Sequence, residues 1–351
     1  MSVRTNGAGH LRGGRRGLAW RFNGEDRVAA GCFAVLAVLP LVTSGYIIYI
    51  LPQYMLFGVL AISLGLLWGF AGIISFGQAA FFAIGGYVMG LTMQQDLPVN
   101  AAYLGIILAT LAGGLVALII GYFLFSAGVR STYFVLATLA LSIIVEQVAK
   151  SQSHITGGWN GLYVDRMTLT LGSAVEVSLF DDTPMYYLVF VLFVTAYVLV
   201  TWIMRSRFGK VIIGIRENED RVAALGFNIS LYKTLAFGLS GLLAGFAGAL
   251  YATHAGFVHP SLAGVLFSTE VVVWVAIGGR NVLLGALAGG ILVSTMSNYL
   301  NALTPTYWQL IVGLIFIVFI VMFRNGLAGM VQSAYEAVSA RGKGRGRAAS
   351  D

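Results

Sequence analysis

Long apolar runs separated by short polar breaks dominate the chain. After a first run from about Val28 to Leu51, further runs lie near 54–74, 79–95, 100–125, 131–149, 185–204, 233–253, 263–278, 282–300 and 307–324. An α-helix needs about 20 apolar residues to cross the hydrocarbon core of a bilayer. The pattern therefore predicts an all-α, polytopic membrane bundle of about ten transmembrane helices. A range of about eight to ten is allowed, because the polar breaks at 75–78 and 278–281 could be re-entrant turns.

The composition supports this class. Hydrophobic residues make up 58% of the 351 and charged residues only 10%, too few polar side chains to cover a water-soluble globule. Cys32 is the single cysteine, which excludes an intramolecular disulfide. The four histidines are scattered at 10, 154, 254 and 259, so no metal site is expected.

The basic residues orient the chain. If the N-terminus lies inside and ten crossings follow, 19 of the 21 Lys and Arg residues fall on the cytoplasmic side, and only Lys150 and Arg166 fall outside. Cytoplasmic segments of membrane proteins carry this excess of positive charge. We therefore expect both termini in the cytoplasm and a transmembrane domain over 28–330. The net charge of +7 is explained by this orientation, so no nucleic-acid partner is expected. Two disordered basic tails, 1–27 and 331–351, would flank this domain.

Two loops are too long to be simple connectors. The external loop 150–184 has mixed acidic, aromatic and β-branched content, which suits a surface facing a soluble partner. The cytoplasmic segment 205–232 contains a charged stretch that predicts a short amphipathic helix from Val211 to Leu225, ended by Gly226. Docking of a soluble partner would explain such a helix, although an ordinary charged surface helix has the same pattern.

Some polar or glycine positions in or beside the spans are candidates for a translocation path or gate. Carboxylates inside a membrane are costly and usually face a cavity or a partner. The acids Glu146 and Glu270 could line the path, form a latch, or serve only as hydrogen-bond acceptors. The remaining candidates are the polar break with Ser75 and Gln78 and a turn that ends the fifth span with Gly157, Gly158, Asn160 and Gly161.

Glycine motifs indicate helix packing. The pairs Gly86/Gly90, Gly241/Gly245 and Gly285/Gly289 have the spacing that lets helices approach closely in lipid. A Gly-Phe-Ala-Gly sequence occurs at 69–72 and again at 245–248. With five spans in each half, this echo adds the expectation of an inverted repeat, a plan found in many transporters.

The chain has no ATP site and no catalytic constellation of its own. The Gly-Lys pairs at 209–210 and 342–343 are not followed by Ser or Thr, as a phosphate-binding loop requires. No cluster of histidines or facing acids suggests a membrane enzyme. If ATP drives transport, another subunit must hydrolyse it, so no cofactor is expected here and ATP and Mg²⁺ would be bound by that partner.

Ordered motifs over most of 54–330 resemble the LivM-type permeases of branched-chain amino-acid importers. In chain order they are Gly69 to Phe82 followed by Gly85-Gly86-Tyr87, Tyr133-Phe134 with Thr138 to Leu141, Thr156 to Leu162, Ser206 to Gly226, Ala244 to Tyr251, and Glu270 leading to Gly278-Gly279-Arg280. The segment 216–226 also resembles the EAA-type coupling segment of importer permeases. That resemblance implies polar contacts with an ATP-binding subunit from Arg216, Glu217 and Glu219, close approach at Ala223 and Ala224, and a turn at Gly226.

The resemblance implies a multi-pass protein of the bacterial inner membrane, assembled with a second related permease subunit, two ATP-binding subunits and a periplasmic or extracellular solute-binding protein. Import of branched-chain or other hydrophobic amino acids is the first expectation. The family also includes urea and short-amide permeases, and the runs 157–161 and 271–280 resemble that branch as well. A proton-coupled secondary transporter that uses Glu146 or Glu270 is a third alternative.

Overall fold

The computed structural model describes residues 14–43, 45–95, 100–129, 131–171, 175–178, 181–322 and 326. It divides into two compact units, Met1–Ser44 and Gly45–Asp351, and each is described by itself. The predicted basic tail 331–351 lies outside the described residues, as does the beginning of the first tail.

The first unit consists of helix α1, Gly14–Val42. Helix α1 begins at Gly14, inside the segment 1–27 that was expected to be a disordered tail. The only proline of the helix, Pro40, lies near its C-terminal end, so no proline interrupts the helix before that point. The helix also ends before the expected Leu51. The next helix, α2, begins at Tyr46 after Gly45, which has φ 78°, so Pro52 lies inside this second helix.

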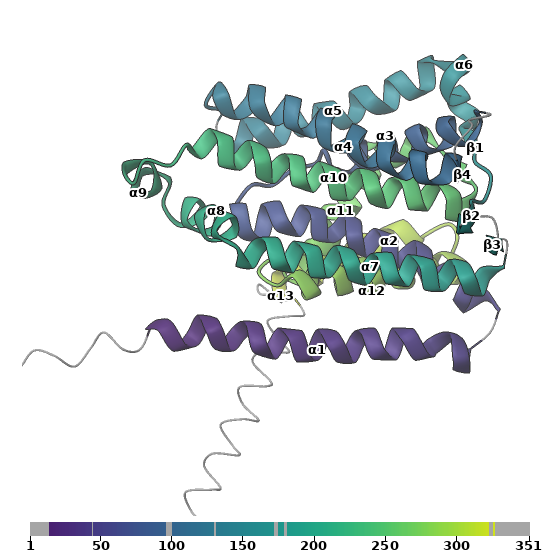
Figure 1. Ribbon diagram of the computed structural model, residues 1–351, viewed down its shortest axis with the longest axis horizontal. Coiled ribbons are helices and arrows are strands. Elements are labelled where there is room, and N and C mark those ends of the chain that lie inside the picture. The colour runs from purple at the N-terminus through teal and green to yellow at the C-terminus, as the bar shows by residue number, and fades with distance from the viewer. Residues whose placement is uncertain are drawn as a thin grey trace, which may run out of the picture. The chain divides into compact units, whose positions relative to one another are not determined.

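The second unit is a helical bundle with short strands (Figure 1). Its long helices are α2 (Tyr46–Gly65), continued by the π-helix η1 (Leu66–Ala71), α3 (Gln78–Met93), α4 (Ala101–Ser126), α5 (Ser131–Ser151), α7 (Asp182–Arg205), α10 (Ile229–Ala255), α11 (Val265–Gly278), α12 (Leu283–Leu303) and α13 (Trp308–Met322). Shorter helical elements are α6 (Ser153–Thr156), η2 (Gly158–Asn160), α8 (Arg207–Glu217), α9 (Glu219–Ala224) and η3 (Pro260–Ala263).

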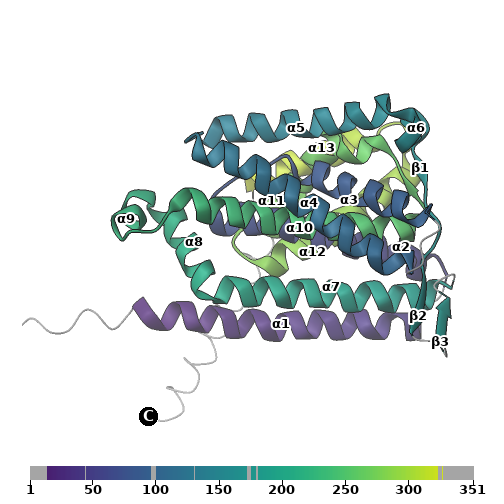
Figure 2. The ribbon, with the colours of Figure 1, turned by 45° about the horizontal axis from the view of Figure 1, so that its top comes forward.

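The strands form two small antiparallel pairs. Strand β1 (Leu162–Tyr163) pairs with β4 (Phe257–Val258), and β2 (Thr168–Leu171) pairs with β3 (Val175–Ser178). In both ribbon views these strands lie at one end of the bundle, and α8 and α9 lie at the opposite end (Figures 1 and 2). The two long loops of the sequence therefore occupy opposite ends of the bundle.

The prediction of an all-α membrane bundle is confirmed. Within the described residues, six helices are long and apolar enough to cross a membrane: Tyr46–Ala71, Ala101–Ser126, Thr132–Ser151, Asp182–Arg205, Ile229–Ala255 and Leu283–Leu303. Three shorter apolar helices, α3, α11 and α13, follow the predicted runs. The described residues thus do not establish ten full-length spans, because α3 has 16 residues and α11 has 14.

Helix α10 packs against α4, α3 and α2 in the interior of the bundle. Glycines allow the close approach, as their spacing predicted. A Cβ added to Gly245 would lie 2.7 Å from the carbonyl oxygen of Ala109 and 3.2 Å from the Cα of Gly113, both on α4. The backbone of Gly245 also packs directly against Gly85 of α3. One position on α10 therefore sets the distance to two neighbouring helices.

The two Gly-Phe-Ala-Gly segments adopt different structures. Residues 69–72 form the end of the π-helix and a left-handed turn at Gly72, with φ 73°. Residues 245–248 lie within the uninterrupted helix α10. The sequence echo thus has no counterpart in local structure that would support an inverted repeat.

Replacing Gly245 with Val should destabilise the bundle by about 1–3 kcal/mol, because the new side chain overpacks the backbone of α4 at Ala109 and Gly113. The comparison is Gly313→Ala on α13, where an added Cβ meets nothing within 4 Å. Thermal unfolding in detergent, followed by size-exclusion profile, is expected to show a clear loss for Gly245→Val and none for Gly313→Ala. Equal stability of the two variants would contradict this account of the packing.

Candidate functional site

A break in the helix that begins with α2 lies inside the bundle. The π-helix η1 ends at Gly72, and the chain is non-helical until α3 begins at Gln78. Ser75 and Gln78 are both buried, with exposures of 0% and 1%. A break at membrane depth leaves backbone N–H and C=O groups without their helical partners, which is costly unless other groups bind them.

Hydroxyl groups of α5 bind the exposed backbone of the break. The N–H of Phe76 donates to Oγ1 of Thr138 at 3.1 Å, and Oγ of Ser142 donates to the carbonyl oxygen of Phe76 at 2.7 Å. Within the break, the N–H of Gly77 donates to Oγ of Ser75 at 3.1 Å. Because Ser142 lies in the middle of α5, the polar break at 75–78 is a buried turn and not a connection at the membrane surface.

The same hydrogen bonds extend to three further helices. Oγ of Ser268 on α11 donates to Oγ of Ser142 at 3.2 Å. Oγ of Ser63 on α2 donates to Oε1 of Gln78 at 3.0 Å, and Oγ of Ser240 on α10 donates to the carbonyl oxygen of Ser63 at 2.9 Å. Helices α2, α5, α10 and α11 are thus joined around the break by buried polar contacts, which we call the break network.

The segment predicted as one amphipathic helix consists of two, α8 and α9. Asn218 separates them, because its side-chain oxygen accepts from the N–H of Arg221 at 2.8 Å and so caps a new helix. Gly226, with φ 85°, ends α9 as expected. The N–H groups of Gly226 and Phe227 donate to the carbonyl oxygens of Ala223 and Val222, the pattern of a Schellman motif.

Arg216 connects α8 to the break. Its guanidinium donates to the carbonyl oxygen of Gly69 in η1, and a Cβ on Gly72 would lie 2.8 Å from its Cγ. Glu219 forms an ion pair with Lys233 of α10 at 2.6 Å. Glu217, Ala223 and Ala224 are exposed. Of the predicted coupling residues, Glu217, Ala223 and Ala224 thus lie on an exposed surface. Arg216 instead joins this surface to the interior of the bundle through its contact with Gly69.

The turn after α5 lies at the end of the bundle that carries the strands. Gly157, Gly158 and Gly161 all have positive φ, between 60° and 74°, as their sequence suggested. Asn160 is exposed beside them. Nε2 of His259 lies 3.1 Å from the carbonyl oxygen of Trp159, so this turn is held against the segment that follows β4.

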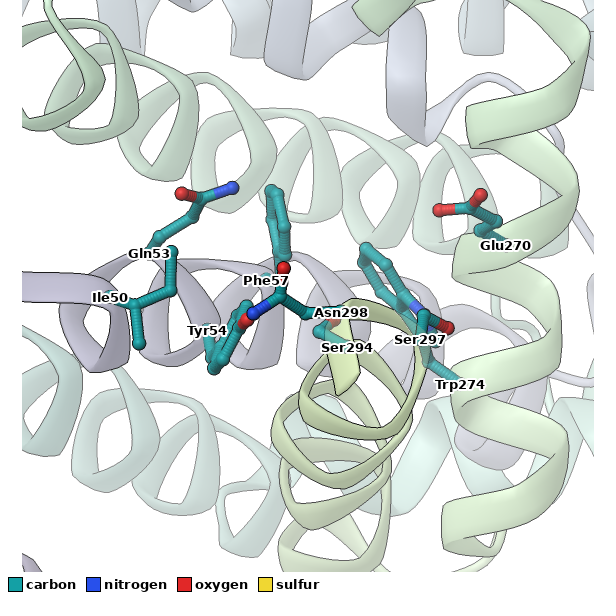
Figure 3. A pocket seen from close by; sticks show the side chains of 9 residues that line it. All are labelled: Ile50, Gln53, Tyr54, Phe57, Glu270, Trp274, Ser294, Ser297 and Asn298. Carbon is teal, nitrogen blue, oxygen red and sulfur yellow. The ribbon is translucent and has the colours of Figure 1, made fainter. Parts of the chain in front are cut away.

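A recess of about 160 Å³ lies between α2, α11 and α12 (Figure 3). It is lined by Ile50, Gln53, Tyr54, Phe57, Glu270, Trp274, Ser294, Ser297 and Asn298. The two predicted membrane carboxylates differ in their surroundings. Glu146 forms an ion pair with Lys150 at 2.7 Å on the same helix, outside this recess, whereas Glu270 lies in its wall.

A family described as branched-chain amino acid transport system, permease component, matches residues 46–321. The chain belongs to this permease family. Curated relatives include the high-affinity branched-chain amino acid permease LivM of Salmonella typhimurium and that of Escherichia coli, each 27% identical to the permease over 88% of its chain and 76% of the relative.

The ribose import permease RbsC of Haemophilus influenzae is a further relative, 24% identical over 88% of the permease and 95% of its own length. No solved structure matches the permease. The relatives are permease components of transport systems, in agreement with the expectation of a transport subunit.

The predicted site residues of the permease do not form one site. Ser75 and Gln78 lie in the break network, Glu270 in the recess, and the coupling residues and the glycine turn at opposite ends of the bundle. Sequence reasoning missed Thr138, Ser142, Ser268, Ser63 and Ser240, because a hydroxyl in an apolar run usually bonds within its own helix. The one signal for them in the sequence was the polar break at 75–78, because its backbone N–H and C=O groups need hydrogen-bond partners from other helices.

Replacing Ser142 with Ala should destabilise the permease by about 1–3 kcal/mol, because the carbonyl oxygen of Phe76 loses a buried partner. Thr195→Val is the matched control, since the Thr195 side chain is exposed and, among the described residues, its hydroxyl donates to the carbonyl oxygen of Val191 in its own helix. Thermal unfolding in detergent should separate the two variants. A loss as large for Thr195→Val would mean that the break network makes no special contribution.

Proposed function

We propose that the permease is the membrane subunit of an ATP-driven importer of branched-chain or other hydrophobic amino acids. The matches to two LivM permeases over 88% of the chain support this substrate class. On this proposal a second related permease subunit completes the path, and two ATP-binding subunits supply the energy with their own ATP and Mg²⁺. A solute-binding protein delivers the amino acid.

The charge pattern supports an orientation for this proposal. The α8–α9 end carries basic residues of the segment 205–232, and the positive-inside rule assigns such a segment to the cytoplasm. The ATP-binding subunits would then dock on α8 and α9, where Glu217, Ala223 and Ala224 are exposed. The strand-bearing end, with the glycine turn at 157–161, would receive the solute-binding protein.

The contact of Arg216 with Gly69 is the observation that carries the ATP-driven part of the proposal. It joins the proposed docking segment to the π-helix directly before the buried break. Any displacement of α8 by an ATP-binding subunit would act on the backbone of η1. Broken helices commonly form the binding sites of transporters. Where hydroxyl groups bind the backbone of such a break, the backbone groups can change from one hydroxyl to another and stay hydrogen-bonded during a movement.

Import of a neutral sugar is the second candidate. The match to the ribose permease of Haemophilus influenzae extends over 95% of that protein's length. The side chains Gln53, Ser297 and Asn298 in the recess offer amide and hydroxyl groups that could also bind a polyol. The two candidates differ in whether the solute carries charge.

Uptake assays in proteoliposomes with the complete transport system test the proposal. We expect ATP-dependent import of labelled leucine, with no import of labelled ribose or urea and no loss when the proton gradient is collapsed. Import of ribose instead would favour the second candidate. Uptake that follows the proton gradient and persists without an ATP-binding subunit would contradict the ATP-driven mechanism.

Replacing Arg216 with Ala should lower the leucine imported per ATP hydrolysed on the order of fivefold, the effect of losing about 1 kcal/mol of coupling between α8 and η1. Lys210→Ala removes an exposed positive charge from the same helix and should leave the ratio unchanged. Both variants should insert and co-purify with the ATP-binding subunit. An unchanged ratio in Arg216→Ala would refute this route of coupling.

A further inference from the structure

Glu270 lacks a counter-ion among the residues that the structure describes. It lies half-buried in α11, and its carboxylate has no hydrogen bond or ion pair with them. The other carboxylate inside a predicted span, Glu146, is neutralised by Lys150 at 2.7 Å. A carboxylate at membrane depth is costly without a cation, so the difference between the two glutamates calls for a ligand or a partner at Glu270.

The side chains beside Glu270 also favour a cation. Trp274 lies one helical turn further along α11, and its ring stacks with that of Phe57 with 5.1 Å between centroids. Phe57 also stacks with Tyr251, with 5.6 Å between centroids, so these rings form a closed apolar wall beside the carboxylate. The lining contains no lysine or arginine that could pair with Glu270. This end of the recess therefore combines one negative charge with two aromatic rings.

The polar remainder of the lining is neutral. Figure 3 shows Gln53 of α2 and Glu270 of α11 on different sides of Phe57. Nδ2 of Asn298 donates to the hydroxyl of Tyr46 at 2.8 Å, and Oγ of Ser294 is buried without a partner among the described residues. These amides and hydroxyls can donate to a carboxylate, so the recess matches a solute that is cationic at one end and a hydrogen-bond acceptor at the other.

Resting on the proposed import function, we propose that the recess binds the transported solute during its passage, with the ammonium group of the solute at Glu270. The volume of the recess, about 160 Å³, suits a small solute. The site thus selects small primary ammonium compounds, which include amino acids, over neutral solutes such as ribose and urea.

Protection of an introduced cysteine tests this site without measuring transport. Ser297→Cys is made in a Cys32→Ser background, and the full chain in membrane vesicles is treated with neutral methyl methanethiosulfonate. Isopentylamine and leucine should slow labelling, whereas 4-methylpentanoate, ribose and urea should not. Adding Glu270→Gln should weaken protection by isopentylamine about tenfold to a hundredfold, the worth of one charge-assisted hydrogen bond.

Two further variants keep the test interpretable. Glu270→Asp retains the charge and should retain most of the protection. Thr269→Val changes the neighbouring, exposed residue of α11 and should have no effect, because its hydroxyl donates to the carbonyl oxygen of Val265 in the same helix. Protection by isopentylamine that survives Glu270→Gln unchanged, or equal protection by ribose, would overturn the proposal.

Leucine uptake by the complete transporter separates this proposal from the proposed function. Import of leucine without protection by isopentylamine would overturn the ammonium site and leave the importer intact, whereas absence of leucine import would overturn the importer itself. Co-purification gives the remaining outcome. One result would overturn the solute site: isopentylamine gives no protection when Glu270 is present, and Glu270→Gln, but not Glu270→Asp, loses the second permease subunit. The partner subunit would then supply the counter-ion of Glu270.

Discussion

The break between η1 and α3 depends on one physical constraint, that no backbone polar group in a membrane interior can be left without a partner. The hydroxyls of Thr138 and Ser142 meet this constraint by binding the backbone of Phe76. Their positions on α5 fix how deeply the break enters the bundle. Ser268 then ties α11 to the same point, so the helix that carries Glu270 is positioned by the hydrogen bonds that make the break tolerable. Packing through Gly245 holds α3, which begins at the break, against α10.

The break also explains how α8 can be connected to the interior of the bundle. A continuous helix from α2 to α3 would not expose its carbonyl oxygens to a side chain from α8. At Gly69 and Gly72 the π-helix ends and the backbone becomes accessible, and Arg216 binds there. A guanidinium offers several donors in a rigid plane, so it can follow a shift of the carbonyl groups while it keeps a hydrogen bond. The absence of a side chain at Gly72 leaves room for the stem of Arg216.

Much of the fold could be predicted from the sequence because the span signal is local. Apolar runs predicted eight helices within a few residues, namely α3, α4, α5, α7, α10, α11, α12 and α13, and Gly226 predicted the end of α9. The first boundary was misplaced, since the first run was expected to end at Leu51, whereas α1 ends at Val42 and α2 begins at Tyr46. Asn218 could have been recognised as a helix cap, because asparagine is a preferred N-cap residue. Its side-chain oxygen accepts from the N–H of Arg221, three residues further along the chain. The partners of the break could not be predicted, since Thr138 and Ser142 lie about sixty residues away and only the packing of α5 against α3 brings them there.

The two membrane glutamates illustrate why a residue type alone does not define a role. Glu146 and Glu270 looked equivalent in sequence, as acids in apolar runs. Lys150 follows Glu146 by four residues, a spacing that places both on one helix face, so the sequence contained the means to set Glu146 aside. No basic residue stands three or four positions from Glu270 on α11. Its own helix therefore offers it no counter-ion, and the recess that it faces is lined by rings and neutral polar groups from α2 and α12. A charge that the fold leaves uncompensated at a cavity wall is the feature that a passing cation can use.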